Sequence, residues 1–251
     1  MTDDDTRELD ELLDATLTID DDAIMPLLHT GEVEVHGRMP WSSNGTFLVS
    51  VSTGVERIQA IYKPEAGERP LWDFPPGLWR REVATYALAF GLGWPVIPPT
   101  VTRDGPLGIG SLQVFVPSRY EQHYFTIRDD DRHRDALQQL GVLDLIANNT
   151  DRKGGHVLLA RDDRVWGIDH GLNFHEDPKL RTVLWDWAGD PIPGRLLDAV
   201  AAWLDRRGEA DLVELLAPEE VEATRDRAGL VLQHGTFPVD HTGRQHPWPL
   251  V

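Results

Sequence analysis

The stretch Asn149-Thr150-Asp151-Arg152-Lys153-Gly154-Gly155-His156-Val157-Leu158-Leu159 contains the first of two acidic residues on which the prediction of the fold rests. The second is in Gly167-Ile168-Asp169-His170-Gly171, which begins eight residues later. Asp151 lies in a polar loop after an apolar segment, and Asp169 ends a predicted β-hairpin formed by 156–160 and 164–168. Because a hairpin folds the chain back on itself, it can bring both carboxylates to one cleft.

Two carboxylates of this kind are what phosphoryl transfer from ATP requires. One orients or deprotonates the attacking hydroxyl, and the other holds the metal ion that bridges the phosphates. We therefore interpret Asp151 as the catalytic residue and Asp169 as a metal ligand. His156 is a candidate second ligand. Because Mg²⁺ prefers oxygen, His156 could instead favour Mn²⁺, donate a hydrogen bond or serve only the hairpin.

The N-terminal half offers a lysine and a carboxylate for the same chemistry. Residues 57–62 alternate between polar and apolar types, which predicts a strand that ends at Lys63. Lys63 is one of only three lysines among 24 basic residues. Its ammonium group could bridge the α- and β-phosphates of ATP. Glu82, near the start of a helix predicted for 78–90, is its candidate partner, although neighbouring arginines offer Glu82 a local surface pair.

A turn between two predicted strands is a candidate phosphate site. Its residues are Ser42, Ser43, Asn44, Gly45 and Thr46. Small residues in such a turn let backbone N–H groups approach phosphate oxygens. An ordinary hairpin turn is the alternative, and the order of the other candidate residues along the chain favours the phosphate site.

The pattern of apolar residues predicts an α+β fold with two lobes. Alternating segments predict an antiparallel sheet that carries one helix, and the second half of the chain is mostly of helical period. The predicted ranges are an acidic leader at 1–22, a β-rich nucleotide-binding lobe at 23–116, a helical catalytic lobe at 117–233 and an irregular tail at 234–251.

Composition excludes several classes of function. The chain has no cysteine, so disulfides and thiol nucleophiles are absent, and it has no apolar run of about 18 residues that would insert in a membrane. Its net charge of −18 disfavours nucleic acid as a partner. The leader holds ten acidic residues and one arginine, which predicts a solvated segment or, alternatively, a docking segment that uses its leucines. We expect a cytoplasmic protein.

Four segments resemble the phosphatidylinositol 3-/4-kinase-like superfamily, which includes the HipA-type kinases. They are Ile61-Tyr62-Lys63-Pro64, Arg81-Glu82-Val83-Ala84-Thr85-Tyr86, Asn149-Thr150-Asp151-Arg152 and Gly167-Ile168-Asp169-His170-Gly171. More narrowly, residues 30–210 resemble a group of short bacterial proteins that are phosphatidylinositol-kinase-like. The family usually has Asn where His156 stands and Phe where His170 stands.

The resemblance implies a protein-kinase-like fold that uses ATP with Mg²⁺ or Mn²⁺. It implies that Lys63 binds ATP, that Glu82 holds Lys63, and that the hinge from Gln113 through Val114 and Phe115 to Val116 contacts adenine. The acceptor is then a protein or small-molecule hydroxyl, with nucleotidyl transfer as a variant of the same site. Two alternatives stay open: a pseudokinase that acts by binding, and a metal-dependent phosphohydrolase built on His156, Asp169, His170 and His175.

Overall fold

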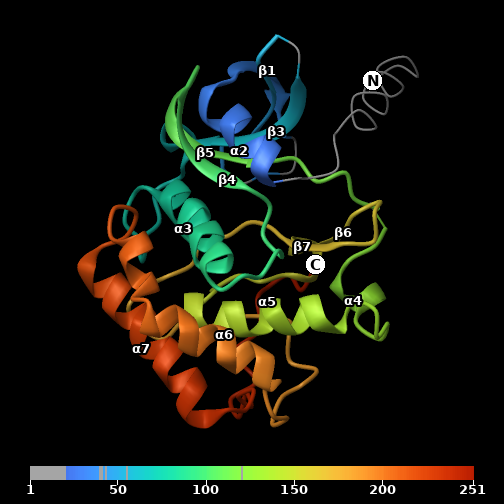
Figure 1. Cartoon of the computed structure of the whole chain (residues 1–251), viewed down its shortest axis with the longest axis vertical. Coiled ribbons are helices and arrows are strands. Elements are labelled where there is room, and N and C mark those ends of the chain that lie inside the picture. The colour runs from blue at the N-terminus through green and yellow to red at the C-terminus, as the bar shows by residue number, and fades with distance from the viewer. Residues whose placement is uncertain (1–20, 40–41, 43, 55, 120) are drawn as a thin grey trace. The chain divides into compact units, whose positions relative to one another are not determined.

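The computed structural model describes residues 21–39, 42, 44–54, 56–119 and 121–251 (Figure 1). The chain divides into two compact units. Unit 1 runs to Val83 and continues with Pro98–Pro117, and unit 2 comprises Ala84–Ile97 and Ser118–Val251. Residues 1–20 of the predicted acidic leader lie outside the described residues. The last two leader residues belong to helix α2, Asp21–Thr30.

In the part of the chain that the structure describes, unit 1 is built on a five-stranded antiparallel sheet of order β1-β2-β3-β5-β4. The strands are β1 (Glu32–Arg38), β2 (Phe47–Ser52), β3 (Arg57–Pro64), β4 (Thr100–Gly105) and β5 (Gly108–Val114). Strand β4 begins only at Thr100, although the strand-forming residues Val96 and Ile97 come shortly before it. Pro98 and Pro99 precede Thr100 and lack the N–H groups that a strand ladder needs.

The two faces of this sheet carry different side chains, because successive residues of a strand point to opposite faces. Ile58, Ala60 and Tyr62 of β3 join the apolar core that also contains Ile24, Leu27 and Leu28 of α2. The intervening residues of β3 therefore lie on the other face. That face carries Ile61 together with polar residues, since Ser111 and Gln113 of β5 are the cross-strand partners of Lys63 and Ile61.

Helix α3 (Leu78–Gly91) belongs to both units. The predicted domain ranges placed this helix wholly in the N-terminal lobe. In the structure its residues from Ala84 onward group with unit 2. The physical reason is its contacts there: Asn173 donates a hydrogen bond to Thr85, and Arg206 donates one to the carbonyl of Gly91.

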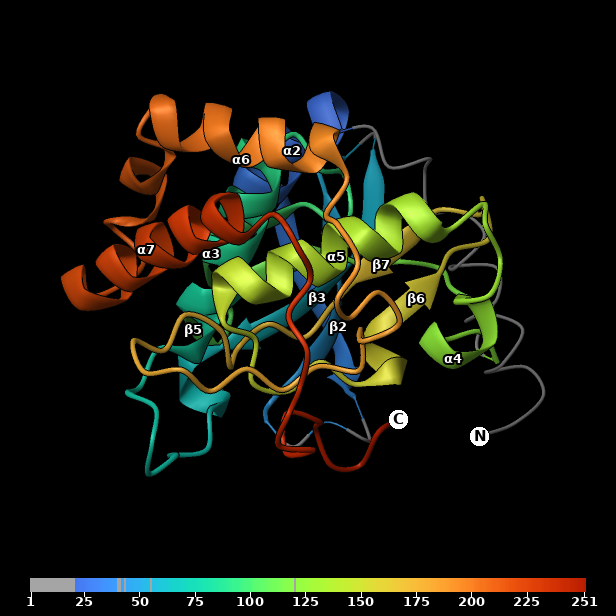
Figure 2. The same cartoon turned by 90° about the horizontal axis from the view of Figure 1, so that it is seen from below.

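Unit 2 is mostly helical and contains one short hairpin. Its helices are α4 (Tyr124–Ile127), α5 (Arg134–Ala147), α6 (Gly194–Asp205) and α7 (Pro218–His234), and the hairpin pairs β6 (Val157–Leu159) with β7 (Val165–Gly167). Helix α7 packs against α5 and α6 (Figure 2). None of the helices in the described residues is long and apolar enough to cross a membrane. The predicted α+β class, with an antiparallel sheet and a mostly helical C-terminal part, is confirmed.

Candidate functional site

Lys63 and Glu82 form an ion pair within unit 1. Lys63 lies near the end of β3, and Glu82 is in the second turn of α3. The carboxylate is almost fully buried, at 2% exposure, whereas the lysine side chain is 22% exposed. The structure therefore brings together the lysine and the helix carboxylate that the sequence suggested as partners. It also leaves part of the cation accessible.

The turn at 42–46 has most of its described backbone donors bonded inside unit 1. Ser43 lies outside the described residues. The N–H of Gly45 donates to the carbonyl of Gly67 at 2.7 Å, and that of Thr46 to the carbonyl of Asn44 at 2.9 Å. Gly45 is required here, because a Cβ on it would lie 2.8 Å from the Cα of Gly67. Phosphate binding by this turn stays a prediction. Its Ser42 and Thr46 hydroxyls are hydrogen-bonded to each other at 2.7 Å.

The predicted adenine-contacting segment, 113–116, is held by its own strand neighbours. The N–H of Val114 donates to the carbonyl of Pro99, and that of Phe115 donates to the carbonyl of Gln59, each at 3.0 Å. The side chain of Gln113 donates to the hydroxyl of Thr100 at 2.8 Å. Val116 follows at the end of the segment and is buried. These bonds make the segment a continuation of the sheet, on the side of unit 1 that includes Lys63.

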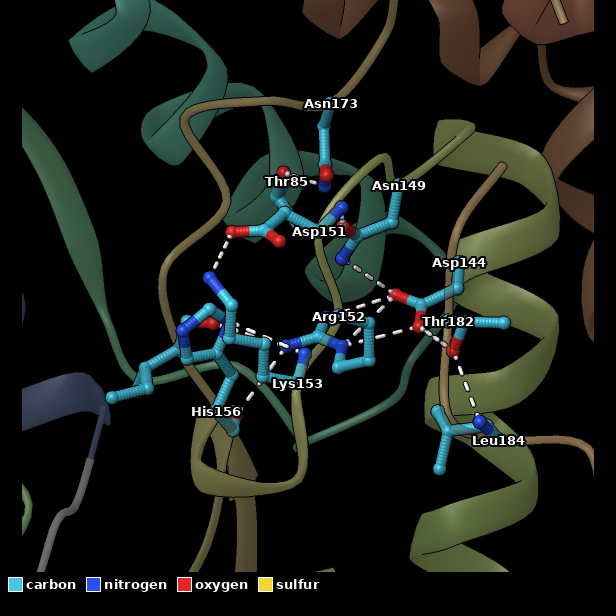
Figure 3. A network of polar contacts seen from close by, with 11 residues as sticks. Thr85, Asp144, Asn149, Asp151, Arg152, Lys153, His156, Asn173, Thr182 and Leu184 are labelled. Atoms are coloured by element: carbon cyan, nitrogen blue, oxygen red, sulfur yellow. Dashed lines mark hydrogen bonds and ion pairs between the residues drawn. The ribbon is translucent and has the colours of Figure 1, made fainter. Parts of the chain in front are cut away.

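In unit 2, Asp151 is oriented by the residues around it (Figure 3). Helix α5 ends at Ala147 and is capped by Asn148, whose backbone is left-handed with φ of 51°, a conformation that asparagine tolerates better than most residues. The side-chain oxygen of Asn149 accepts the N–H of Asp151 at 2.9 Å. The ammonium group of Lys153 lies 2.6 Å from Asp151 Oδ2. Asp151 is partly exposed, so its carboxylate is both held and accessible.

A buried ion pair lies behind this loop, and the sequence reasoning gave neither of its members a role. Arg152 is fully buried and donates to Asp144 of α5 through Nε and Nη2, with the shortest contact at 2.9 Å. Asn149 and Thr182 also donate to the Asp144 carboxylate, at 2.9 and 3.0 Å (Figure 3). A buried charge that is paired and fully hydrogen-bonded is well compensated.

The same arginine connects the Asp151 loop with the segment that carries Asp169. Arg152 Nη1 donates to the carbonyl of Ile168 at 3.0 Å and approaches that of His156 at 3.4 Å. The N–H of Ile168 donates to the His156 carbonyl at 2.9 Å. Asp169 follows with φ of 60°, a left-handed conformation that is uncommon outside glycine and marks a site worth testing for function. The Asp169 side chain is more than half exposed.

His156 and Asp169 are neighbours, with His156 Nε2 3.5 Å from Asp169 Oδ2. Burial lowers the pKa of His156, so the imidazole is neutral at pH 7. Its Nδ1 accepts the N–H of Lys153 at 3.4 Å. In a neutral ring the hydrogen is then on Nε2, which faces Asp169. This arrangement suits a hydrogen bond to Asp169 better than a metal bond, and Asp169 is the side chain whose chemistry fits a hard cation.

The remaining histidines of the predicted sites have other surroundings. His170 is fully buried, and His175 accepts the N–H of Asp177 through Nδ1 at 3.0 Å. Among the described residues, no group of three or more His, Asp or Glu side chains is arranged to hold a metal ion. A phosphohydrolase centre assembled from several protein ligands is therefore not formed by the residues that the structure describes.

The last residues of the chain contact the Asp151 loop. The N–H of Gly154 donates to the carbonyl of Leu250 at 2.7 Å. The tail is held further back, where the N–H of Thr182 donates to the carbonyl of Gln245 at 3.0 Å. Gly154 is required at this point, because a Cβ would lie 2.8 Å from the ring of Phe125. The tail thus fixes the turn between Lys153 and His156.

The known proteins that are similar to this chain differ in their sequence identity and in the share of the chain that aligns with them. No protein-family model matches the chain. It is similar to protein Rv2133c of Mycobacterium tuberculosis, with 39% identity over 276 aligned positions that cover 93% of this chain and 96% of the relative. It is 29% identical to phosphatidylinositol 4-kinase gamma 7 of Arabidopsis thaliana over 178 positions, 57% of this chain and 26% of the relative. The Helicobacter pylori proinflammatory kinase CtkA matches with a TM-score of 0.48 and 11% identity, covering 84% of this chain and 94% of CtkA.

Proposed function

We propose a phosphotransferase function for this chain, which belongs to the same family as the protein Rv2133c of Mycobacterium tuberculosis. In this proposal the γ-phosphate of ATP moves to a hydroxyl group of a protein or a small molecule. The observation that carries the proposal is the Lys63–Glu82 pair, in which a buried carboxylate holds a lysine whose side chain is partly exposed. Such a cation can bind phosphate oxygens while it keeps its partner.

The residues of unit 2 supply the groups that act on the acceptor. Asp151 is partly exposed and is oriented by Asn149, so it would accept the hydrogen of the attacking hydroxyl. Lys153, at 2.6 Å, would balance the negative charge of Asp151. Arg152 does not contact the substrate in this proposal, because its side chain is fully buried against Asp144.

The proposal includes a divalent metal ion bound together with the nucleotide, which would neutralise charge on the phosphates. Mg²⁺ usually takes one or two protein carboxylates together with substrate phosphates, so it needs no dedicated protein cluster. Asp169 fits as that carboxylate, with its exposed side chain. His156 would orient Asp169 through the Nε2 hydrogen, and a direct bond to the metal would require that hydrogen to leave Nε2.

The similarity to a plant phosphatidylinositol 4-kinase supports a kinase-type reaction and does not extend to its acceptor. The net charge of −18 disfavours an anionic lipid surface. We therefore favour a protein or small-molecule hydroxyl as the acceptor, despite the resemblance to phosphatidylinositol 3-/4-kinase-like proteins.

The test measures ADP formation and transfer of label from γ-labelled ATP, with Mg²⁺ and Mn²⁺ in parallel. We expect turnover by the wild-type chain and its loss in Asp151→Asn and Asp169→Asn. Asp162→Asn is the matched control, because Asp162 is exposed at the tip of the same hairpin and pairs with Arg164. Unchanged turnover in Asp169→Asn would count against the proposal.

A second candidate is a nucleotide-binding module that performs no transfer. The observation in its favour is that His156 Nδ1 accepts a backbone N–H, which leaves Nε2 to carry the ring hydrogen towards Asp169. The phosphatidylinositol 3-/4-kinase-like superfamily, which the chain resembles, usually has Asn at this position. This candidate predicts thermal stabilisation by ATP without ADP formation. His156→Asn would then raise turnover from the wild-type level, whereas the phosphotransferase proposal expects turnover already in the wild type.

A further inference from the structure

Gln59 lies on the same face of the sheet as Lys63. Gln59, Ile61 and Lys63 alternate along β3 with the residues that pack against α2, so they share the opposite face. A strand rises about 3.3 Å per residue, which puts Gln59 about 13 Å from Lys63 along β3. This separation is comparable with that between the phosphates and the base of an extended nucleoside triphosphate.

The side-chain oxygen of Gln59 is a buried acceptor without a hydrogen-bond partner among the described residues. Gln59 is 4% exposed. Buried polar atoms of native proteins are nearly always paired, and an exception calls for an explanation such as a ligand. The buried oxygen of Gln59 therefore points to a donor that the described residues do not supply, such as a ligand.

The predicted adenine-contacting segment is bonded directly to this residue. The carbonyl of Gln59 accepts the N–H of Phe115 at 3.0 Å. Gln113, on the same face, has its amide orientation set by Thr100: the Thr100 hydroxyl donates to the carbonyl of Pro98, so it accepts from Gln113 Nε2. Two carboxamides thus line the face between Lys63 and the end of β5.

We propose that Gln59 Oε1 accepts a hydrogen bond from the 6-amino group of adenine and thereby selects ATP over GTP. This inference rests on the proposed function, because it requires that a nucleotide binds with its phosphates at Lys63. Adenine presents an amino donor where guanine presents a carbonyl acceptor. The Gln59 oxygen would therefore accept a hydrogen bond from the amino group of adenine. Opposite the carbonyl of guanine it would have no hydrogen-bond donor.

The experiment measures the dissociation constants of ATP, GTP and purine riboside triphosphate, which lacks the 6-amino group. The wild-type chain should bind ATP roughly tenfold more tightly than either analogue, as expected for one hydrogen bond to a buried acceptor. In Gln59→Leu this preference should disappear, mainly through weaker ATP binding. Gln138→Leu is the matched control, because Gln138 is a buried glutamine of α5 in unit 2 and should leave the ratio unchanged.

The outcomes separate this inference from the proposed function. ATP binding with the same preference in Gln59→Leu, or a wild-type chain without preference, overturns the role of Gln59 alone. No binding of any nucleotide by the wild type overturns the proposed function and this inference together. The ratio of the dissociation constants of ATP and its analogues for the wild-type chain tests the inference even without a variant. If Gln59→Leu fails to fold, Gln59→Asn withdraws the oxygen by one methylene and should lower the preference.

Discussion

Two ion pairs, one in each unit, differ in what surrounds their cations. In unit 1, Glu82 is buried but Lys63 keeps part of its surface exposed. In unit 2, both Asp144 and Arg152 are buried, and the guanidinium group is fully used by Asp144 and by backbone carbonyls. A cation with an exposed surface can bind an incoming anion, whereas an enclosed one can only position its neighbours. From the burial of the two cations we therefore expect Lys63 to bind a ligand and Arg152 to act structurally.

The largest effect is expected from replacing Arg152, the enclosed cation. Arg152→Met leaves Asp144 buried without its charge partner, so we expect a loss of about 3–5 kcal/mol in the free energy of unfolding. Urea denaturation measures it. Arg134→Met is the control, because Arg134 pairs with Asp131 at the exposed start of α5 and should cost less than about 1 kcal/mol. Equal losses in the two variants would contradict the structural role of Arg152.

A conservative change at Lys63 should reduce activity or nucleotide affinity and leave stability almost unchanged. Lys63→Arg keeps a positive charge beside Glu82 but replaces a compact ammonium with a planar fork. We expect turnover or nucleotide affinity to fall at least tenfold, while the free energy of unfolding changes by less than about 1 kcal/mol. Full activity in Lys63→Arg would indicate that Lys63 acts on Glu82 and not on a ligand.

A smaller effect is expected from a residue that completes the enclosed pair. Thr182 donates to Asp144 and accepts the N–H of Leu184. Thr182→Val keeps the shape and removes both bonds, so the free energy of unfolding should fall by about 1–2 kcal/mol. Thr236→Val, at an exposed threonine of the same unit, should stay within about 0.5 kcal/mol. If Thr182→Val is neutral, Asp144 does not depend on this hydroxyl.

The smallest effect concerns the pH dependence of stability. Burial lowers the pKa of His156 from its ordinary value of 6.5. The unfolded chain then binds a proton before the folded chain does, so this contribution to stability is present above pH 6.5 and is lost as the pH falls through the folded pKa. His156→Asn should flatten the melting temperature between about pH 7 and 5, and His241→Asn, at an exposed histidine, should not. Parallel curves for His156→Asn and the wild type would contradict this.

The sheet and the Lys63–Glu82 pair were accessible from sequence because their signals are local. Alternation along 57–62 predicts β3 and the face on which Lys63 lies, and the helical period after Leu78 predicts α3 with Glu82 near its start. Pairing then follows from proximity of the two elements. The unequal exposure of the two partners could not be predicted, because it depends on what covers each side chain after packing.

The Asp144–Arg152 pair was missed because a carboxylate in an amphipathic helix is usually read as a surface residue. A signal was present: Asp144 interrupts the run Gly141-Val142-Leu143-Asp144-Leu145-Ile146-Ala147, where a charge needs a buried partner. The hydrogen bond between the 42–46 turn and Gly67 could not be predicted from the sequence either, because no local pattern links these segments. Sequence reasoning thus singled out accessible side chains as candidates for a site and missed the enclosed ones that hold them.

The tail contact at Gly154 has a practical consequence for every experiment above. Val251 Cγ1 would lie 3.8 Å from a Cβ placed on Gly155, so a purification tag fused after Val251 would emerge beside the loop that carries Asp151. Affinity handles, fluorophores and immobilisation chemistry are best attached at the opposite end. If a protein with a C-terminal tag is inactive, it should be prepared again without that tag before its lack of turnover is interpreted.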